Sequence, residues 1–439
     1  MFLVYGLQKT GISITKLLEK KNQAFKIWDD SPLVRKNFKK KYESKLFFNP
    51  THDNLNNFKK IFVSPGISLR QKKFQIKNKS FQLHRDLNLY ISNTENQKII
   101  SVTGTNGKST TTKLIGDILK KNNIKTFVGG NIGEPLCNSL ISKKKFEFHA
   151  IELSSFQLET VKDFDSKISI ITNLSADHLD RYKNLVDYIN QKKKIISKNG
   201  INLFSIDDKY SRKIFLQKKI KNKISFSILD QSADVYMEKG FIIDNFFKNN
   251  RKVLINNISR ELEGHFNYQN ILIAYICSKI LKLPEKNFIH VIKNFKGLPY
   301  RSSIIFKNKN LKVINNSKST NINSTINSIK NYSKIYLILG GIAKEKNFEI
   351  LLKYQKRIIC VYTFGKSATF IGNKLKKSLN VKKFVNLKSL MKQLMKDLKK
   401  NTDKSNILFA PACTSFDQYE NFEERGKHFS KLITESLNK

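Results

Sequence analysis

The chain has 439 residues, with 81 Lys or Arg against 35 Asp or Glu, so its formal net charge is +46. This length predicts about two or three domains, and 40% hydrophobic residues supply enough apolar surface for packed cores, which excludes a disordered chain. The charge suggests a nucleic-acid partner, but only ten of the 81 basic residues are Arg, the residue suited to bidentate contacts with phosphates and bases. Lys is spread along the whole chain beside Asn and Ile, which share A/T-rich codons, so drift in genome composition explains the charge better than a basic patch.

The predicted elements alternate between short apolar strands and amphipathic helices. In chain order they are a strand at 2–5, a helix at 10–21, strands at 24–28, 61–63 and 98–102, a helix at 108–120, and strands at 312–314, 335–339, 360–364 and 407–410. This βαβ order predicts mainly parallel sheets in an α/β fold. Polar, turn-prone residues predict domain boundaries near 93 and 297.

A reduced, cytoplasmic protein is expected from what the sequence lacks. The first residues, Met1–Gly6, have no basic segment followed by an apolar run, as a signal peptide would. No segment approaches the roughly 20 apolar residues of a membrane span. The four cysteines are isolated, without C-x-x-C spacing, and we expect each to be a small buried hydrophobe; they are Cys137, Cys277, Cys360 and Cys413.

The strongest local signal is a glycine turn between an apolar strand and a helix, in the segment Ser101–Thr110. Gly104 and Gly107 allow the backbone to approach an anion, and the helix start supplies free N–H groups and partial positive charge. Lys108 would reach terminal phosphates, and Ser109 or Thr110 would bind Mg²⁺. The loop has two residues between its glycines, fewer than the usual P-loop pattern. A plain turn with a helix cap is the alternative.

A second glycine turn, Gly6–Gly11, follows the first strand, and Asp29 ends the second strand. The spacing imitates a dinucleotide fingerprint, but Gln8 replaces the middle glycine, so a pyrophosphate would not sit as close. We interpret the turn as a nucleotide or diphosphate site of another kind, with a purely structural turn as the alternative.

Two later strands end in candidate metal ligands. Glu152 ends one apolar strand and His178 lies in a polar cluster after another, where strand ends of a doubly wound sheet line the ligand crevice. We therefore expect both near the phosphate loop. Three consecutive lysines, 192–194, follow on a predicted helix, where a solvated charge run is the simplest interpretation. After the last strand, residues 410–426 suit a loop that enters a substrate crevice.

In chain order, these segments resemble the Mur ligases, and within them the members that add D-glutamate. The resemblance covers the whole chain and rests on Gly104–Thr110, Gly129–Gly133, Glu152–Leu158, Asp177–Tyr182, Gly297–Arg301, Ser317–Asn321 and Pro411–Gly426. The phosphate loop marks the superfamily alone. Glu152–Leu158 and Pro411–Gly426 distinguish the D-glutamate-adding branch from its sisters.

The resemblance implies three domains. It implies a Rossmann-like N-terminal domain over 1–93 that binds the UDP part of the substrate. A central P-loop ATPase domain would cover 94–297, and a Rossmann-like C-terminal domain over 298–439 would bind the incoming amino acid. The implied enzyme uses ATP and Mg²⁺ to join D-glutamate to UDP-N-acetylmuramoyl-L-alanine through an acyl phosphate, in peptidoglycan precursor synthesis.

The resemblance also implies a role for individual residues. The implied catalytic residues are Lys108, His178 and Lys192. The implied ATP contacts are Gly104, Thr105, Asn106, Gly107, Lys108, Ser109, Thr110, Asn267, Asn270, Arg301 and Asn316. The implied UDP-substrate contacts are Lys9, Thr10, Asp29, Gly66, Asn131 and His178. The implied D-glutamate contacts are Thr320, Lys344, Ser415 and Phe422. The implied metal ligands are Ser109, Thr110, Glu152, His178 and Lys192 as a carbamate, which the motif places four residues after Tyr188.

The sequence departs from the family pattern at several positions outside the core metal and phosphate positions, and these departures bear on the affinity for ATP and D-glutamate. An expected aspartate is Asn316, so one nucleotide contact loses its charge, and Tyr300 and Phe266 replace histidines. Ile342 and Ala343 replace a more polar pair, and Asn347 replaces an acid.

Other functions remain as alternatives to test. A sister Mur ligase or a folylpolyglutamate synthase-like ligase would use a different amino acid. The charge is the motive for considering a nucleic-acid-stimulated ATPase. The N-terminal turn is the motive for considering a dinucleotide oxidoreductase, and Gln8 counts against that function. We expect small-molecule substrates, a monomer, and no nucleic-acid or membrane partner.

Overall fold

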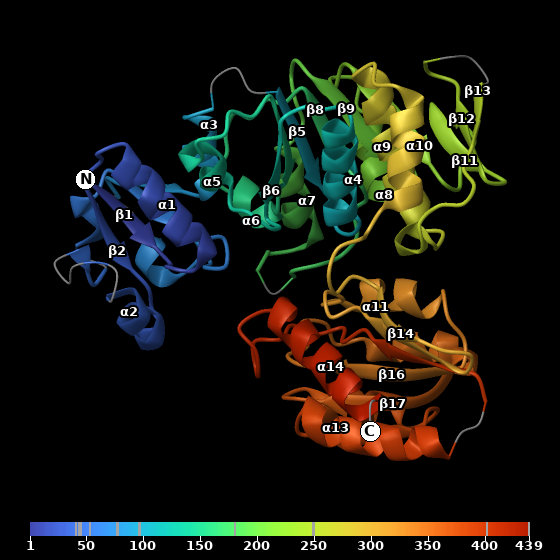
Figure 1. Ribbon diagram of the computed structural model, residues 1–439. Helices are drawn as coiled ribbons and strands as arrows, with labels where there is room; N and C mark the ends of the chain where they lie inside the picture. Colours follow the sequence, from blue (N-terminus) through green and yellow to red (C-terminus); the bar gives the residue numbers. More distant parts are fainter. Residues whose placement is uncertain are drawn as a thin grey trace. The chain divides into compact units, whose positions relative to one another are not determined.

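The computed structural model of the protein describes residues 1–39, 42, 46–51, 54–75, 79–94, 98–179, 181–247, 251–400 and 403–437. The chain forms two compact units (Figure 1). The first consists of Met1–Ile258 with Asn267–Asn294, and the second of Ser259–Phe266 with Phe295–Lys439. The first unit holds two sheets and the second holds one, and helices flank each sheet, so the fold is α/β.

The N-terminal sheet is parallel, with the strand order β2-β1-β3-β4. Its elements are β1 (Phe2–Tyr5), α1 (Lys9–Lys20), β2 (Phe25–Trp28), α2 (Pro32–Lys39), η2 (Leu55–Asn57), β3 (Lys60–Val63), η3 (Lys72–Phe74), β4 (Gln82–His84) and α3 (Asp86–Ile91). Alternate side chains of β1 enter different cores, because a strand has a period of two residues. Val4 packs with Leu17 of α1, whereas Leu3 and Tyr5 pack with Phe74 on the other face.

The central sheet has the order β13-β12-β11-β10-β9-β8-β5-β7-β6. Its strands are β5 (Lys98–Thr103), β6 (Thr126–Gly130), β7 (Phe148–Glu152), β8 (Ile168–Ile171), β9 (Ile201–Ser205), β10 (Lys223–Ser227), β11 (Val235–Glu238), β12 (Phe241–Asp244) and β13 (Arg251–Leu254). Its helices are α4 (Lys108–Lys121), α5 (Leu136–Ile141), α6 (Ser155–Leu158), α7 (Leu185–Lys193), α8 (Lys209–Phe215), α9 (Asn267–Ile280) and α10 (Glu285–Asn294). From β5 the chain crosses to β6 on one side and later reaches β8 on the other, so a ligand crevice is expected at the carboxyl end of β5.

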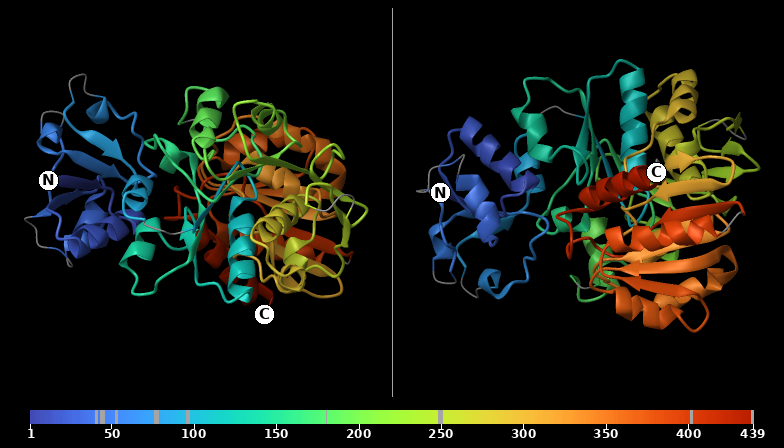
Figure 2. Two further views of the ribbon diagram at one scale, coloured as in Figure 1. Left: turned by 90° about the horizontal axis from the view of Figure 1, so that it is seen from above. Right: turned by 60° about the horizontal axis from the view of Figure 1, so that its bottom comes forward.

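The sheet of the second unit has the order β14-β15-β19-β16-β17-β18. Its elements are η4 (Arg260–Leu262), β14 (Ser303–Lys307), β15 (Leu311–Asn315), α11 (Ile322–Ile329), β16 (Ile335–Gly340), η5 (Phe348–Arg357), β17 (Ile358–Phe364), α12 (Ala368–Leu375), β18 (Val381–Phe384), α13 (Leu387–Lys399), β19 (Ser405–Phe409) and α14 (Phe422–Leu437). Helices α13 and α14 pack on one face of this sheet, and α11 and α12 pack on the other (Figure 2).

Most predicted elements are confirmed to within a residue or two at each end, and the four cysteines are free and buried as expected. The prediction missed the antiparallel strands. In the extension of the central sheet β12 pairs antiparallel with both β11 and β13, and in the second unit β14 pairs antiparallel with β15. The turn between β11 and β12 is Lys239-Gly240, with positive φ at both residues (44° and 84°), and lysine is a weak signal for such a turn.

The predicted domain ranges 1–93, 94–297 and 298–439 each contain one sheet, and the ranges themselves stay a prediction. Within the described part of the chain, no helix has the length and hydropathy needed to cross a bilayer.

Candidate functional site

The backbone of the phosphate loop requires glycine at two positions. The loop joins the end of β5 to the start of α4, and φ is +141° at Gly104 and +83° at Gly107, values that favour glycine. A Cβ on Gly104 would lie 2.0 Å from Oγ1 of Thr172, and one on Gly107 would lie 2.6 Å from Oδ1 of Asn270. At these two glycines the loop therefore lies against the end of β8 and against α9 without space for a side chain.

Hydrogen bonds from the end of β8 fix the middle of the loop. The backbone N–H of Thr105 donates to the carbonyl of Asn173 (2.8 Å), and that of Asn106 donates to its side-chain oxygen (3.0 Å). The hydroxyl of Thr172 donates to the carbonyl of Asn106 (2.7 Å). The loop is thus held in shape by the neighbouring strand, as a preformed anion site requires.

Two lysine amines converge on one carbonyl of the loop. Nζ of Lys108 donates to the carbonyls of Gly104 (2.9 Å) and Thr105 (2.8 Å). Nζ of Lys192 donates to the same Gly104 carbonyl (2.7 Å) and lies 3.3 Å from Oγ1 of Thr103. Burial, followed by repulsion from Lys108, holds the pKa of the Lys192 amine well below its ordinary value.

The structure distinguishes Lys192 from its two lysine neighbours. Lys192 is 2% exposed and points from α7 toward the loop. Lys193 is only partly buried, and Lys194 donates to the carbonyl of Glu159 (2.6 Å). Successive helical residues point about 100° apart, so one of the three enters the site. It is the residue that the motif spacing selects.

Glu152 lies beside the loop because of the strand register. Strand β7 pairs parallel with β5, with Glu152 opposite Val102. Its carboxylate is 1% exposed and accepts hydrogen bonds from the hydroxyl of Ser109 and from Nδ2 of Asn131 (2.8 Å). Of the two hydroxyls predicted to bind Mg²⁺, that of Ser109 therefore contacts Glu152. Thr110 is only partly buried.

His178 lies in the loop after β8, in a left-handed backbone conformation (φ +54°). Its ring packs edge-on against Phe156 at 4.8 Å between centroids, and Nε2 is 3.6 Å from the Asp177 carboxylate. Among the described residues there is no group of three or more His, Cys, Asp or Glu side chains placed to hold a metal. Asp180 lies outside the described residues.

Two asparagines predicted to bind ATP reach the loop from a segment about 160 positions later in the chain. Asn270 of α9 accepts a hydrogen bond from Oγ1 of Thr111 (2.9 Å), and its Nδ2 donates to Oδ1 of Asn267 (2.9 Å). Asn270 also lies beside Gly107, and Asn267 is hydrogen-bonded to Asn270. The structure therefore places both asparagines at the phosphate loop.

The predicted UDP-substrate residues of the N-terminal sheet lie at strand ends. Lys9 and Thr10 begin α1, directly after the first glycine turn. Both oxygens of Asp29 accept backbone N–H groups, from Leu7 (2.7 Å) and Ser31 (2.9 Å), so this carboxylate also shapes the turn. Gly66 follows β3 and has open space where a Cβ would be.

The remaining predicted residues belong to the second unit. Thr320, Lys344 and Ser415 follow the neighbouring strands β15, β16 and β19, and Phe422 begins α14. Parallel strands place these carboxyl ends at one edge of the sheet. Arg301 precedes β14. The side-chain nitrogen of Asn316 donates to Ser328 (2.7 Å), inside the same unit.

Sequence reasoning missed Arg425, which joins the same three strand ends. Its guanidinium is fully buried and donates to the carbonyls of Ser317 (2.7 Å), Cys413 (3.0 Å) and Gly340 (3.3 Å). Burial lowers its pKa to about 10. The sequence offered one signal for this residue, because Arg425 is one of only ten arginines and lies inside the polar segment 410–426.

One departure from the family pattern has a visible partner. The ring of Tyr300 lies on Gly426, where a Cβ would approach it to 2.5 Å. The tyrosine thus fits because position 426 has no side chain.

The chain is similar to known proteins over nearly its whole length. Residues 102–278 match the Mur ligase middle domain. The UDP-N-acetylmuramoylalanine–D-glutamate ligase of Rickettsia bellii (strain RML369-C) is 36% identical, over 98% of this chain and 96% of that protein. The protein of the same name from Buchnera aphidicola subsp. Schizaphis graminum is 37% identical, over 99% of this chain and 97% of that protein.

Solved structures show the same fold. The UDP-N-acetylmuramate-alanine ligase MurC from Thermotoga maritima superposes with a TM-score of 0.65 at 18% identity and covers 99% of both chains. The MurF ligase from Thermotoga maritima in complex with ADP gives a TM-score of 0.61 at 17% identity, over 100% of this chain and 95% of that chain. The chain therefore belongs to the Mur ligases, in the family of the UDP-N-acetylmuramoylalanine–D-glutamate ligases.

Proposed function

We propose that this chain is an ATP-dependent ligase that joins D-glutamate to UDP-N-acetylmuramoyl-L-alanine, with ADP and phosphate as the other products. The observation that carries the proposal is the meeting of Lys108, Ser109, Glu152 and Lys192 at one phosphate loop. It occurs in a chain to which three UDP-N-acetylmuramoylalanine–D-glutamate ligases are 35–37% identical over nearly its full length.

In this proposal the loop binds the ATP phosphates. Backbone N–H groups at the start of α4 and the ammonium of Lys108 face the phosphates and reduce the repulsion between two anions, the γ-phosphate and the substrate carboxylate. Asn267 and Asn270 hold the nucleotide side of the loop, and Arg301 and Asn316 are further proposed ATP contacts.

The oxygen donors beside the loop fit Mg²⁺, which prefers oxygen ligands. Ser109 and Glu152 offer a hydroxyl and a buried carboxylate in hydrogen-bond contact, and we propose them as ligands together with His178 and Thr110. When bound, Mg²⁺ would neutralise phosphate charge and act as a Lewis acid.

Lys192 is proposed to be a metal ligand in the form of a carbamate. Because its pKa is held low, the amine is available in its neutral, nucleophilic form. It can add CO₂ and release one proton, forming N–COO⁻. That reaction exchanges a neutral amine for an anion attracted to the Lys108 ammonium, at a buried site where charge interactions are strong.

The substrate carboxylate then attacks the γ-phosphorus, releasing ADP and forming an acyl phosphate. The amine of D-glutamate attacks the acyl carbon through a tetrahedral intermediate, loses a proton, and phosphate departs.

We propose that Lys9, Thr10, Asp29, Gly66, Asn131 and His178 bind the UDP-sugar. Thr320, Lys344, Ser415 and Phe422 would hold D-glutamate, with the Lys344 ammonium on a carboxylate. The ranges 1–93, 94–297 and 298–439 are proposed as the three domains.

Phosphate release by the purified protein tests the function. We expect release only when ATP, UDP-N-acetylmuramoyl-L-alanine and D-glutamate are all present. Equal release with L-lysine or diaminopimelate in place of D-glutamate would contradict the amino-acid assignment. Stimulation of ATP hydrolysis by DNA or RNA would instead favour the nucleic-acid alternative.

A further inference from the structure

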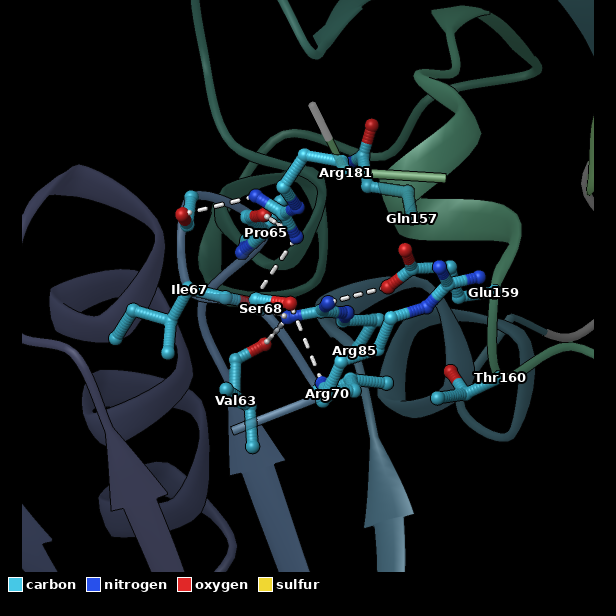
Figure 3. Close-up of polar contacts among 12 residues, drawn as sticks. Val63, Pro65, Ile67, Ser68, Arg70, Arg85, Gln157, Glu159, Thr160 and Arg181 are labelled. Carbon is cyan, nitrogen blue, oxygen red and sulfur yellow. Dashed lines mark hydrogen bonds and ion pairs between the residues drawn. The ribbon is translucent and has the colours of Figure 1, made fainter. Parts of the chain in front are cut away.

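Three of the ten arginines in the chain lie in or contact the loop after β3, residues 64–70 (Figure 3). They are Arg70, which belongs to the loop, and Arg85 and Arg181, which contact it. Arg85 is fully buried, and its Nη1 donates to the carbonyls of Val63 (3.0 Å), Ser64 (2.8 Å) and Ile67 (3.0 Å). Its Nη2 forms an ion pair with Glu159, beyond the end of α6. This loop carries Gly66, a proposed UDP-substrate contact.

Arg181 contacts the same loop from the segment that carries His178 (Figure 3). Its Nη1 donates to the carbonyl of Gly66 (3.0 Å), and its Nη2 lies 3.2 Å from the carbonyls of both Pro65 and Ile67. Three consecutive carbonyls therefore share one guanidinium. Its planar fork can serve them together, whereas a lysine ammonium on a flexible stem cannot hold this arrangement.

The other contacts of Arg181 lead to His178. The backbone N–H of Arg181 donates to the carbonyl of His178 (2.9 Å). Its guanidinium lies over the ring of Phe156 (3.9 Å to the centroid), and that ring packs edge-on against the imidazole of His178. A continuous series of contacts thus joins Gly66 through Arg181 and Phe156 to His178.

We propose that Arg181 is a positioning residue that fixes the loop 64–67 and His178 relative to each other, so that a UDP-sugar bound at this loop also orders the imidazole. The inference rests on the proposed function, because it takes Gly66 and His178 as substrate contacts. Arg181 itself acts through the loop carbonyls and the Phe156 ring.

Steady-state kinetics and hydrogen exchange of the full-length protein test this role. Arg181→Ala and Arg181→Lys are compared with Arg251→Ala, a control that removes an arginine paired with Glu285 on the distant edge strand β13. We expect Arg181→Ala to raise the KM for UDP-N-acetylmuramoyl-L-alanine about tenfold, equivalent to about 1.4 kcal/mol. Arg181→Lys should recover part of this loss, and the KM values for ATP and D-glutamate should stay within about twofold. Arg251→Ala should resemble the wild type.

Hydrogen exchange separates positioning from a general loss of structure. In the wild type, UDP-N-acetylmuramoyl-L-alanine should slow exchange both in the loop 64–70 and in the segment that carries His178. In Arg181→Ala the protection of the His178 segment should be lost. Equal protection in that variant, or an unchanged KM, overturns the proposal.

The failure of the proposed function would be distinguishable. If the wild type releases no phosphate with the full substrate set, the function is wrong. Exchange in the absence of ligand still decides the role of Arg181. Faster exchange in both segments of Arg181→Ala supports it, and unchanged exchange in either segment refutes it.

Discussion

Replacing Lys192 by methionine removes the buried amine beneath the phosphate loop and keeps a side chain of similar length. Lys192 is 2% exposed, and its pKa is lowered by burial and by the nearby charge of Lys108. Between the lowered folded-state pKa and the ordinary value of 10.5, the unfolded chain binds a proton that the folded chain does not. Burial of this residue therefore costs more stability as the pH falls through that interval.

The size of the effect follows from the linkage relation. The free energy of unfolding of the wild type, relative to that of Lys192→Met, should fall by about 1.4 kcal/mol for each pH unit lost within the interval. Above the unfolded-state pKa the pH-dependent part of this difference disappears. There the variant should be less stable by about 1 kcal/mol, because the carbonyl of Gly104 loses a hydrogen bond.

Urea unfolding in CO₂-free buffers at a series of pH values below 10.5 measures this slope. Pulse proteolysis measures the unfolding of the first unit separately. Lys113→Met is the matched control, since Lys113 is a partly exposed lysine of α4 paired with Asp117. Phosphate release should be lost in Lys192→Met although the protein remains folded. A pH-independent stability difference would refute the account of the buried amine, and full turnover would refute its role in the site.

Three further substitutions test other parts of the site. Lys108→Ala should abolish phosphate release, and release at the wild-type rate would contradict the loop assignment. Gly107→Ala should raise the KM for ATP at least about tenfold, because a residue at φ +83° costs about 1–2 kcal/mol and its Cβ would clash with a side-chain oxygen 2.6 Å away. Gly240→Ala, at φ +84° with open space around it, carries the same strain without the clash and should leave that KM unchanged. Arg425→Lys should raise the KM for D-glutamate about tenfold with little change for ATP, because an ammonium cannot hold all the carbonyls that the buried guanidinium joins; an unchanged KM for D-glutamate would count against this role.

The local parts of the site could be predicted from the sequence. A strand, two glycines and a helix start within ten residues specify the phosphate loop, and the positive φ angles of Gly104 and Gly107 are the conformations that glycine favours. The apolar strands and the acid at the end of β7 were likewise visible, because strand alternation and helix periodicity are encoded by residues close together in the chain.

The tertiary structure decided which distant residues meet. Three consecutive lysines have the same local sequence signal, and the placement of α7 beside the loop at the end of β5 selects Lys192 as the buried one. Arg425 and Arg181 were missed because each acts on backbone carbonyls from other parts of the fold, and a carbonyl leaves no mark in the sequence. Short-range preferences fix the loop, whereas strand order and helix packing, which bring together segments over 100 residues apart, determine the partners that surround it.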